Sequence, residues 1–267
     1  MIFMKKLFSV LLCLCVFLSI PCTVFAAGKP LDCIVWEDTA DESEEDRLKQ
    51  IFIYKPQGYT TKKQYDVLYV LEGLYSTDNE ALTEEAIADL EDLFAIGYEE
   101  ILVVVIPHSV YRDIPFSDIV KRVDETCSTN RESSGRIIAG FSQGAYYIWN
   151  TIFSKPSYYV LADTYIPMSP IGAKKMMSGN FKKITEESDR IIIYNTCGNE
   201  GVESDYRGLY SGVEQMEAIL ENGKEYGFIE NKNIFRYEAE GGHNWNMCYN
   251  ALQWIFPQIL KRNESTS

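Results

Sequence analysis

The sequence predicts an α/β fold in which a mostly parallel central sheet carries helices on both faces. Three observations support this. The chain has 267 residues, and a chain of this size commonly forms one α/β domain. It contains short, nearly continuous apolar runs, which are typical of strands buried on both faces. These runs alternate with stretches whose apolar residues recur at helical spacing, the pattern of a parallel sheet with crossover helices.

The first strands are predicted near the N-terminal third of the chain. The segment QIFIYKP, Gln50–Pro56, is expected to be a strand, and the polar stretch after it a loop. DVLYVLEG, Asp66–Gly73, follows as a strand with an apolar core. The acidic run DESEED, Asp41–Asp46, is interpreted as a solvated turn between two early strands, because nothing rigid frames its carboxylates for a metal ion.

The middle of the chain supplies a helix and three further strands. In TEEAIADLEDLFAIG, Thr83–Gly97, Ala86, Leu90 and Leu93 recur at helical spacing before a glycine stop. The predicted strands are then ILVVVIP (101–107), RIIAG (136–140) and one within YYVLADTYIPMSP (158–170).

The C-terminal third completes the alternation. RIIIYNTCG, Arg190–Gly198, is predicted as a strand, and LYSGVEQMEAILENGKEYG (209–227) as an amphipathic helix. NIFRYEAEGGH (233–243) is expected to form a last strand and a loop. The final helix is expected over NALQWIFPQIL (250–260), with Pro257 as a candidate break point.

The N-terminal segment has the three parts of a secretory signal. Lys5 and Lys6 supply positive charge, an apolar run covers 7–20, and Val24-Phe25-Ala26 offers small residues for cleavage. A membrane-spanning helix needs about 20 apolar residues, and this run is shorter. We therefore predict a signal peptide over residues 1–26, with cleavage after Ala26 or Ala27. Residues 27–267 then form a single domain, which is secreted and keeps no stable association with the membrane.

The charge balance excludes one class of partner. The whole chain has a formal net charge of −14, and loss of Lys5 and Lys6 leaves 23 basic against 39 acidic side chains, or −16. A protein this acidic repels phosphate backbones and gains nothing from counterion release, so no nucleic-acid partner is expected.

Four of the seven cysteines remain after the expected cleavage: Cys33, Cys127, Cys197 and Cys248. In an oxidising compartment they allow two disulfides in three connectivities, and Cys197–Cys248 is the pairing that the sequence favours. Four buried free thiols fit the sequence equally well. The scattered cysteines do not have zinc-ligand spacing, and no metal or cofactor motif appears.

The segment RIIAGFSQGAYYIW (136–149) contains the pattern Gly-x-Ser-x-Gly between a predicted strand and a helical stretch. This spacing can hold a serine in a strained turn with its hydroxyl exposed. Ser142 is therefore the candidate nucleophile. The backbone N–H of the following residue, Gln143, is expected to donate to the oxyanion, and a second donor, Leu74 N–H, is expected from the turn after the Asp66–Gly73 strand.

A serine hydroxyl needs an adjacent base, and histidine suits that task. The chain has two histidines. His243 follows the last strand in a glycine-rich loop and is the predicted base, whereas His108 is interpreted as a structural or substrate-contacting residue. Active sites gather at the carboxyl ends of parallel strands, so we expect the loops that carry Ser142 and His243 to lie close together.

The third member of the expected triad is an acid that orients the histidine. The acidic segment CGNEGVESDY follows the Arg190–Gly198 strand, so the order along the chain is serine, acid, histidine. We favour Glu200 because a short loop would fix its position best. Asp205 is the alternative, and Glu203 is a third candidate.

These segments together resemble the esterase branch of the α/β-hydrolases over nearly the whole mature chain. This branch includes feruloyl and acetylxylan esterases of carbohydrate esterase family 1, S-formylglutathione hydrolases and enterochelin esterase-like proteins. IYKPQGYTTKKQYDVLYVLEG, RIIAGFSQGAY, YNTCGNEG and EGGHNWNMCYNALQWIF are similar to its opening, nucleophile, acid and histidine segments. The resemblance implies an α/β-hydrolase fold, one catalytic domain over 27–267, and a serine carboxylic-ester hydrolase that needs no cofactor.

The chain departs from the family pattern at two positions. Glu72 stands where the family has a histidine before glycine, which weakens the assignment of the oxyanion donor Leu74. Gly201 stands where the family usually has its acid, so Glu200 requires a shift of one residue and Asp205 an inserted loop. The departures affect the acid and the oxyanion donors rather than the fold class.

The resemblance and the export signal together indicate the substrate class. Export argues against S-formylglutathione hydrolase, whose thiol-ester substrate is intracellular, and leaves extracellular esters. Feruloyl or acetyl esters of polysaccharide are the first choice. A siderophore lactone, transfer of the acyl group to a sugar by the same triad, and a catalytically inactive binding protein remain as alternatives. Six aromatic residues could line the substrate pocket: Tyr75, Tyr111, Tyr146, Tyr147, Trp149 and Trp245.

Overall fold

The computed structural model describes residues 32–36, 49–56, 58–73, 84–95, 98–170, 177–201 and 212–260. The expected signal peptide and the acidic run at 41–46 lie outside these ranges. So do the expected oxyanion donor Leu74 and the acid candidates Glu203 and Asp205.

Within the described ranges, eight strands form one sheet in the order β1-β2-β4-β3-β5-β6-β7-β8. The pairs β1–β2 and β2–β4 are antiparallel, and every other neighbouring pair is parallel. The sheet is therefore mostly parallel, as predicted. The strands are β1 (Asp32–Trp36), β2 (Lys49–Tyr54), β3 (Val67–Leu71), β4 (Leu102–Ile106), β5 (Arg136–Phe141), β6 (Thr164–Met168), β7 (Ile192–Gly198) and β8 (Ile234–Ala239).

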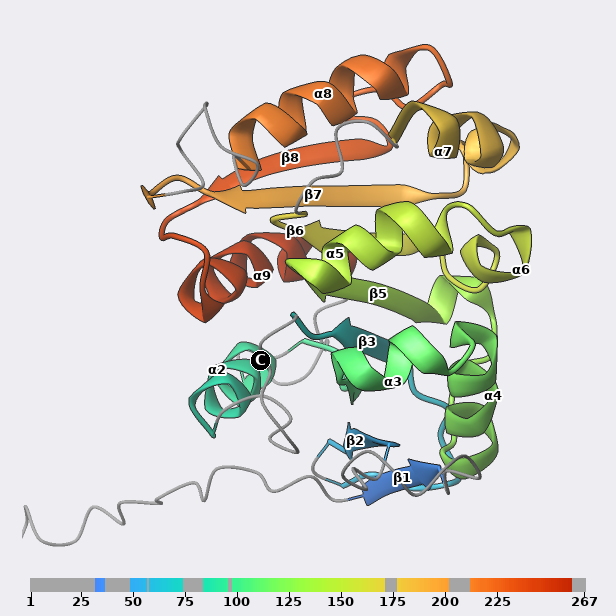
Figure 1. The fold of residues 1–267 in the computed structure, drawn as a ribbon. Coiled ribbons are helices and arrows are strands. Elements are labelled where there is room, and N and C mark those ends of the chain that lie inside the picture. Colours follow the sequence, from blue (N-terminus) through green and yellow to red (C-terminus); the bar gives the residue numbers. More distant parts are fainter. Residues whose placement is uncertain are drawn as a thin grey trace, which may run out of the picture.

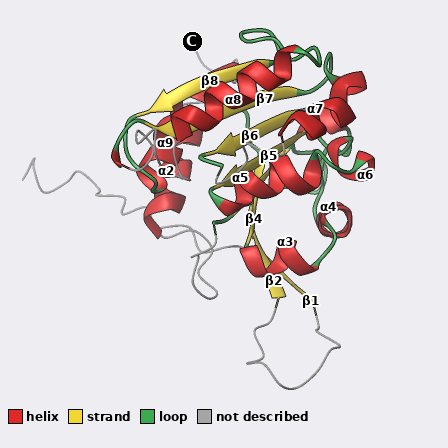
Figure 2. Ribbon diagram, turned by 45° about the horizontal axis from the view of Figure 1, so that its top comes forward, coloured by secondary structure: helices red, strands yellow, loops and turns green. Residues whose placement is uncertain are grey.

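Helices cover both faces of the sheet (Figures 1 and 2). One face carries α2 (Glu84–Ala95) and α9 (Trp245–Ile259), whose apolar residues share one core cluster. The helices that pack into the core on the other face are α3 (His108–Asp113), α4 (Phe116–Thr126), α6 (Pro156–Tyr159), α7 (Met177–Ile184) and α8 (Gly212–Lys224). Short α5 (Gln143–Tyr147) continues into a π-helical turn at Ile148–Ile152, and 3₁₀ turns occur at Ser133–Gly135 and Thr185–Glu187. None of the described helices is long and apolar enough to cross a membrane.

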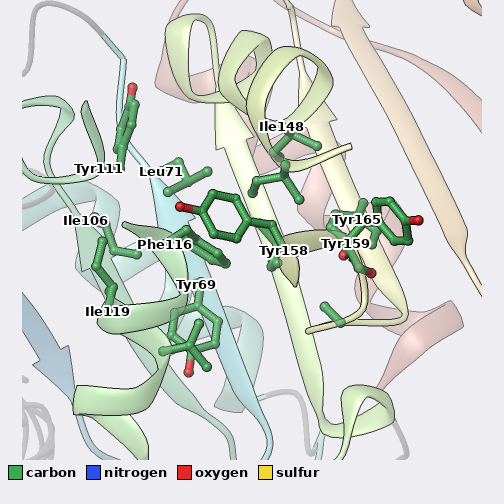
Figure 3. Packing of buried hydrophobic residues seen from close by; sticks show 14 of the residues in the cluster. Tyr69, Leu71, Ile106, Tyr111, Phe116, Ile119, Ile148, Tyr158, Tyr159 and Tyr165 are labelled. Atoms are coloured by element: carbon green, nitrogen blue, oxygen red, sulfur yellow. Dashed lines mark hydrogen bonds between the residues drawn. The ribbon is translucent and has the colours of Figure 1, made fainter. Parts of the chain in front are cut away.

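The alternation of side chains along β3 explains its continuous apolar run. Tyr69 and Leu71 pack into the core on the α3–α8 side, whereas Leu68 and Val70 pack on the α2–α9 side. All five β3 residues are buried. Figure 3 shows part of the core on the α3–α8 side, in which aromatic rings from several helices lie against the sheet. The sheet is thus the middle layer of three, and its long apolar strands follow from burial on both faces.

The final helix differs from the prediction. It begins at Trp245 rather than Asn250, because the Asn244 side chain accepts a hydrogen bond from the Met247 N–H (3.3 Å) and caps the first turn. Pro257 does not break it, and α9 continues to Ile259. The ring lies in the last turn on the exposed side, so only one main-chain hydrogen bond is lost there.

The favoured Cys197–Cys248 disulfide is wrong, because Cys33, Cys127, Cys197 and Cys248 form no disulfide within the described part of the chain. The physical reason is that the sheet lies between the two cysteines. Cys197 in β7 packs with Val213 and Met216 of α8, on one face. Cys248 in α9 belongs to the core cluster on the other face.

Candidate active site

Ser142 lies in a strained turn between β5 and α5. Its backbone has φ 54° and ψ −109°, a conformation that non-glycine residues adopt rarely and at a cost of roughly 1–3 kcal/mol. Hydrogen bonds hold it there: the Ser142 N–H donates to Met168 O at the end of β6 (2.9 Å), and its carbonyl accepts from the Tyr146 N–H (3.0 Å). The strand-to-helix turn expected from the motif is therefore present around Ser142.

The two glycines of the motif allow close backbone contacts on either side of Ser142. A Cβ at Gly140 would lie 2.5 Å from the carbonyl carbon of Gly144. A Cβ at Gly144 would lie 2.8 Å from the carbonyl carbon of Leu71 in β3. Real Cβ atoms do not approach this closely, so the sequence needs glycine at both positions for steric reasons.

The groups around the Ser142 hydroxyl suit an acyl-transfer site. The hydroxyl does not cap α5 and forms no hydrogen bond within the described ranges. Gln143 is the first residue of α5, and the N–H of a first helical residue has no partner within its own helix. The Gln143 N–H thus lies at a helix N-terminus directly beside Ser142, and its role as an oxyanion donor stays a prediction.

The end of β3 lies next to the nucleophile. The register between β3 and β5 pairs Leu71 with Gly140, and a Cβ on Gly73 would lie 3.5 Å from Ser142 Cβ. Glu72 is buried, with 7% of its surface exposed, and its N–H donates to Ile106 O (3.1 Å). The turn from which the second oxyanion donor is expected therefore starts beside Ser142, although Leu74 itself lies outside the described ranges.

His243 is brought close to the nucleophile segment. Its ring lies 4.6 Å, centroid to centroid, from the ring of Phe141, the residue before Ser142. This contact therefore places the imidazole beside the residue that precedes the nucleophile, and the hydrogen bond between His243 and Ser142 stays a prediction. Catalytic hydrogen bonds often form fully only in the substrate complex.

The loop that carries His243 is tied to the loop after β7. The carbonyl of Gly241 accepts from the N–H groups of Asn199 (3.0 Å) and Glu200 (3.1 Å), and the Gly241 N–H donates to Asn199 Oδ1 (3.2 Å). Gly241 has φ 117°, which favours glycine. The predicted acid segment and the predicted base segment therefore meet at one edge of the sheet.

The identity of the acid stays a prediction. The Glu200 side chain is exposed, and within the described ranges its only hydrogen bond comes from its backbone N–H. Asp205 and Glu203 lie outside those ranges. Among the described residues, no group of histidine, cysteine, aspartate and glutamate side chains could hold a metal ion.

His108 occupies a neighbouring position at the start of α3. Its ring lies perpendicular to the Tyr111 ring, at 5.2 Å between centroids. Burial lowers the pKa of His108, the Arg112 charge lowers it further, and Asp113 opposes both effects. The contact with Tyr111 agrees with the structural role expected for His108.

Three of the aromatic residues expected at the pocket have structural positions instead. Trp149 is fully buried between the rings of Phe153 and Phe181, and Tyr111 is 2% exposed, so both belong to the core. Trp245 Nε1 donates to Asp89 Oδ2 (2.8 Å) and joins the start of α9 to α2. Tyr75 lies outside the described ranges.

Sequence reasoning missed Phe141 at this site, and it assigned Tyr111 to the pocket lining rather than to a contact with the backbone of Glu72. Phe141 precedes the nucleophile and its ring contacts His243. A large apolar residue directly before the serine was a visible signal. The Tyr111 hydroxyl donates to the carbonyl of Glu72 (2.7 Å), 39 residues away, and no local pattern indicates this contact.

Comparison with known proteins places this geometry in a fold class. No family model matches the chain, and no curated protein sequence matches it. Solved structures do match. The chain has the α/β-hydrolase fold, as predicted, and the resemblance to esterases that the sequence suggested is confirmed at the level of the fold.

Three of the matching structures show which kinds of protein share this fold. A serine-to-alanine mutant of the feruloyl esterase module from Clostridium thermocellum, complexed with sinapinate, is 16% identical with a TM-score of 0.63, covering 88% of this chain and 91% of that one. A ferulic acid esterase of carbohydrate esterase family 1 from Anaeromyces mucronatus, in complex with ferulic acid, is 18% identical with a TM-score of 0.61, covering 83% and 87%. An S-formylglutathione hydrolase from Staphylococcus aureus is 12% identical with a TM-score of 0.58, covering 87% and 98%.

Proposed function

We propose that this protein is a secreted serine esterase that hydrolyses acyl esters of polysaccharide, feruloyl or acetyl, through an acyl-enzyme. The observation that carries the proposal is the geometry of Ser142. A non-glycine residue at φ 54°, between two sterically required glycines and beside the end of β3, is a costly arrangement that a structural serine would not need.

The mechanism follows from the roles of these groups. Ser142 Oγ attacks the ester carbonyl while His243 takes its proton, and the N–H groups at Gln143 and in the turn after β3 stabilise the oxyanion. Collapse of the tetrahedral intermediate releases the alcohol, which receives the proton from His243. Water then attacks the acyl-enzyme with His243 again acting as base, releasing the acid and restoring Ser142. A carboxylate, for which Glu200 is favoured over Asp205, orients the imidazole.

The substrate class is supported by two independent arguments. The feruloyl esterase neighbours have bound ferulic acid and sinapinate, which are aromatic acyl products or analogues of that chemistry. The N-terminal segment has the pattern of an export signal, which would place the enzyme where polysaccharide esters occur. Export also argues against the intracellular thiol ester that an S-formylglutathione hydrolase takes.

A fluorophosphonate probe and a substrate panel test this function. The wild-type protein should be labelled on Ser142 and should hydrolyse 4-nitrophenyl acetate, and Ser142→Ala should lose both properties while keeping its circular dichroism spectrum. The panel consists of methyl ferulate, acetylated xylan and a catecholate siderophore, of which we expect the first two to be cleaved.

Each competing function gives a different result. Cleavage of the siderophore alone would replace the polysaccharide ester as substrate. A product carrying the acyl group on an added sugar would identify an acyltransferase. A folded protein that neither reacts with the probe nor cleaves any ester would be a binding protein on a hydrolase fold.

A further inference from the structure

A side chain from outside the predicted triad holds the end of β3 against the nucleophile. The Tyr111 hydroxyl, in α3, donates to the main-chain carbonyl of Glu72 at 2.7 Å. On its other side, the peptide N–H of Glu72 donates to Ile106 O of β4. Both ends of residue 72 are therefore fixed, one of them by a tyrosine that comes from a separate helix.

Tyr111 is itself firmly placed. It is 2% exposed, and its ring packs against Tyr147 of α5, 4.8 Å between centroids, as well as against His108. In Figure 3 its hydroxyl points away from Ile106 and Ile119 at one end of the cluster. Burial raises the pKa of Tyr111, and the charges of Glu72 and Tyr147 add to the effect, so the hydroxyl stays protonated as a donor.

The held carbonyl fixes the orientation of the next peptide group. The chain contains no cis peptide bond among its described residues, and in a trans peptide the C=O and the following N–H lie in one plane and point in opposite directions. Holding the Glu72 carbonyl at Tyr111 therefore fixes the plane of the peptide group between Glu72 and Gly73, and Gly73 lies against Ser142. The residue expected to supply the oxyanion donor follows Gly73 directly in the sequence.

We propose that Tyr111 is a positioning residue for the reaction: its hydrogen bond to the Glu72 carbonyl sets the backbone on the oxyanion side of Ser142. Its ring contact with Tyr147 couples that backbone to α5, the helix whose N-terminus is the other expected donor. Because Tyr111 is 2% exposed, we assign its effect to the backbone that it holds rather than to a contact with substrate. This inference rests on the proposed esterase function, because an oxyanion must form for the alignment to matter.

The test compares Tyr111→Phe with Tyr165→Phe. Both variants keep the ring and remove a buried hydroxyl that donates to a main-chain carbonyl, but the Tyr165 hydroxyl donates to Tyr159 O (2.9 Å), near the start of β6 and away from Ser142. Active sites are counted with a fluorophosphonate, so that kcat for 4-nitrophenyl acetate refers to folded enzyme. The affinity for a trifluoromethyl ketone, which binds as a tetrahedral oxyanion, is measured alongside.

We expect Tyr111→Phe to lower kcat per active site about tenfold, to leave KM within about twofold, and to weaken the ketone by the same factor as kcat/KM. Tyr165→Phe should change none of these more than about twofold. If the two variants behave alike, or if Tyr111→Phe loses only active sites while the remaining sites turn over normally, the inference is overturned.

A second variant keeps the inference testable if Tyr111→Phe does not fold. Replacement of Tyr111 by 3-fluorotyrosine retains both ring and hydroxyl and makes the hydroxyl a stronger donor, so kcat should match or exceed the wild-type value. A tenfold loss of kcat in this variant would show that packing matters rather than the hydrogen bond. A wild-type protein that hydrolyses no ester would instead remove the proposed function itself.

Discussion

At the residue scale, the turn that exposes the Ser142 hydroxyl requires glycine, which has no Cβ, at position 144. Gly144 Cα lies so close to the end of β3 that a Cβ would approach both the carbonyl carbon and the Cβ of Leu71 within 3 Å. This contact fixes the start of α5 against β3, and so fixes the Gln143 N–H and the Gly73 turn relative to each other. The same glycine that permits the turn thus brings the Gln143 N–H close to the end of β3, after which the second oxyanion donor is expected.

The cost of filling this contact can be measured. We expect Gly144→Ala to lower the free energy of unfolding by about 2 kcal/mol or more, because the main chain of β3 cannot move away. The matched control is Gly179→Ala in α7, where a Cβ meets nothing within 4 Å and alanine should stabilise by about 0.5–1 kcal/mol. Urea denaturation measures both variants, and equal effects would contradict the steric argument.

The pKa of His108 is a second quantity set by single residues. Burial and the Arg112 guanidinium lower the pKa of His108, while Asp113 raises it. Arg112→Gln should therefore raise the His108 pKa toward that of free histidine, and Asp113→Asn should lower it further. Proton NMR of the imidazole C2–H measures this titration, and the spectrum is simple because the chain has two histidines. Shifts of opposite sign would show that other charges dominate.

At the element scale, a buried ion pair joins α4 to the start of β5, the strand that carries Ser142. Arg136 donates to Asp124 Oδ2 at 2.8 Å, with 8% and 13% of the two side chains exposed, and Thr129 Oγ1 donates to the other carboxylate oxygen at 2.6 Å. Asp124 thus links α4 to the start of β5, at the end of the sheet opposite Ser142.

Removing this carboxylate should be costly. Asp124→Asn leaves Arg136 buried beside a neutral partner, and we expect a loss of about 3 kcal/mol in the free energy of unfolding. Glu221→Gln is the control, because its pair with Lys224 is 78% and 63% exposed and should contribute less than about 0.5 kcal/mol. Thermal and chemical denaturation should rank the variants in that order. A loss for Asp124→Asn no larger than the control would show that the pair contributes nothing.

The elements could be predicted from the sequence to the extent that their signals were local. Continuous apolar runs predict the buried strands, and the two glycines of the Gly-x-Ser-x-Gly pattern predict the turn at Ser142. Helix α4 was missed although Phe116, Ile119, Val120 and Val123 recur at helical spacing, so the signal was present. Helix α3 has six residues, too few for a periodicity, and the Tyr111–Glu72 contact exists only because the fold brings α3 to the end of β3.

At the scale of the whole molecule, the parallel sheet gathers the described candidate residues at one edge. The carboxyl ends of β3, β5, β7 and β8 lie along that edge (Figure 1), and Glu72, Ser142, Glu200 and His243 follow these strands in the sequence. The opposite edge carries structural ion pairs, such as Arg190 with Asp163 and Glu187. Because all the parallel strands share one direction, a single change of register would disperse the site, and the packed cores on both faces prevent such a change.

The same two-faced architecture leads to an expectation about the cysteines of the protein that the predicted signal cleavage would leave. After removal of residues 1–26, four cysteines remain, and the sheet separates Cys197 from Cys248. Protein recovered from the culture medium, denatured without reductant and treated with iodoacetamide, should therefore carry four alkylated thiols and begin at Ala27, as intact-mass spectrometry can show. An intact N-terminus would contradict the signal peptide. Alkylation of four cysteines only after reduction would mean that disulfides form, and that the sheet does not keep these thiols apart.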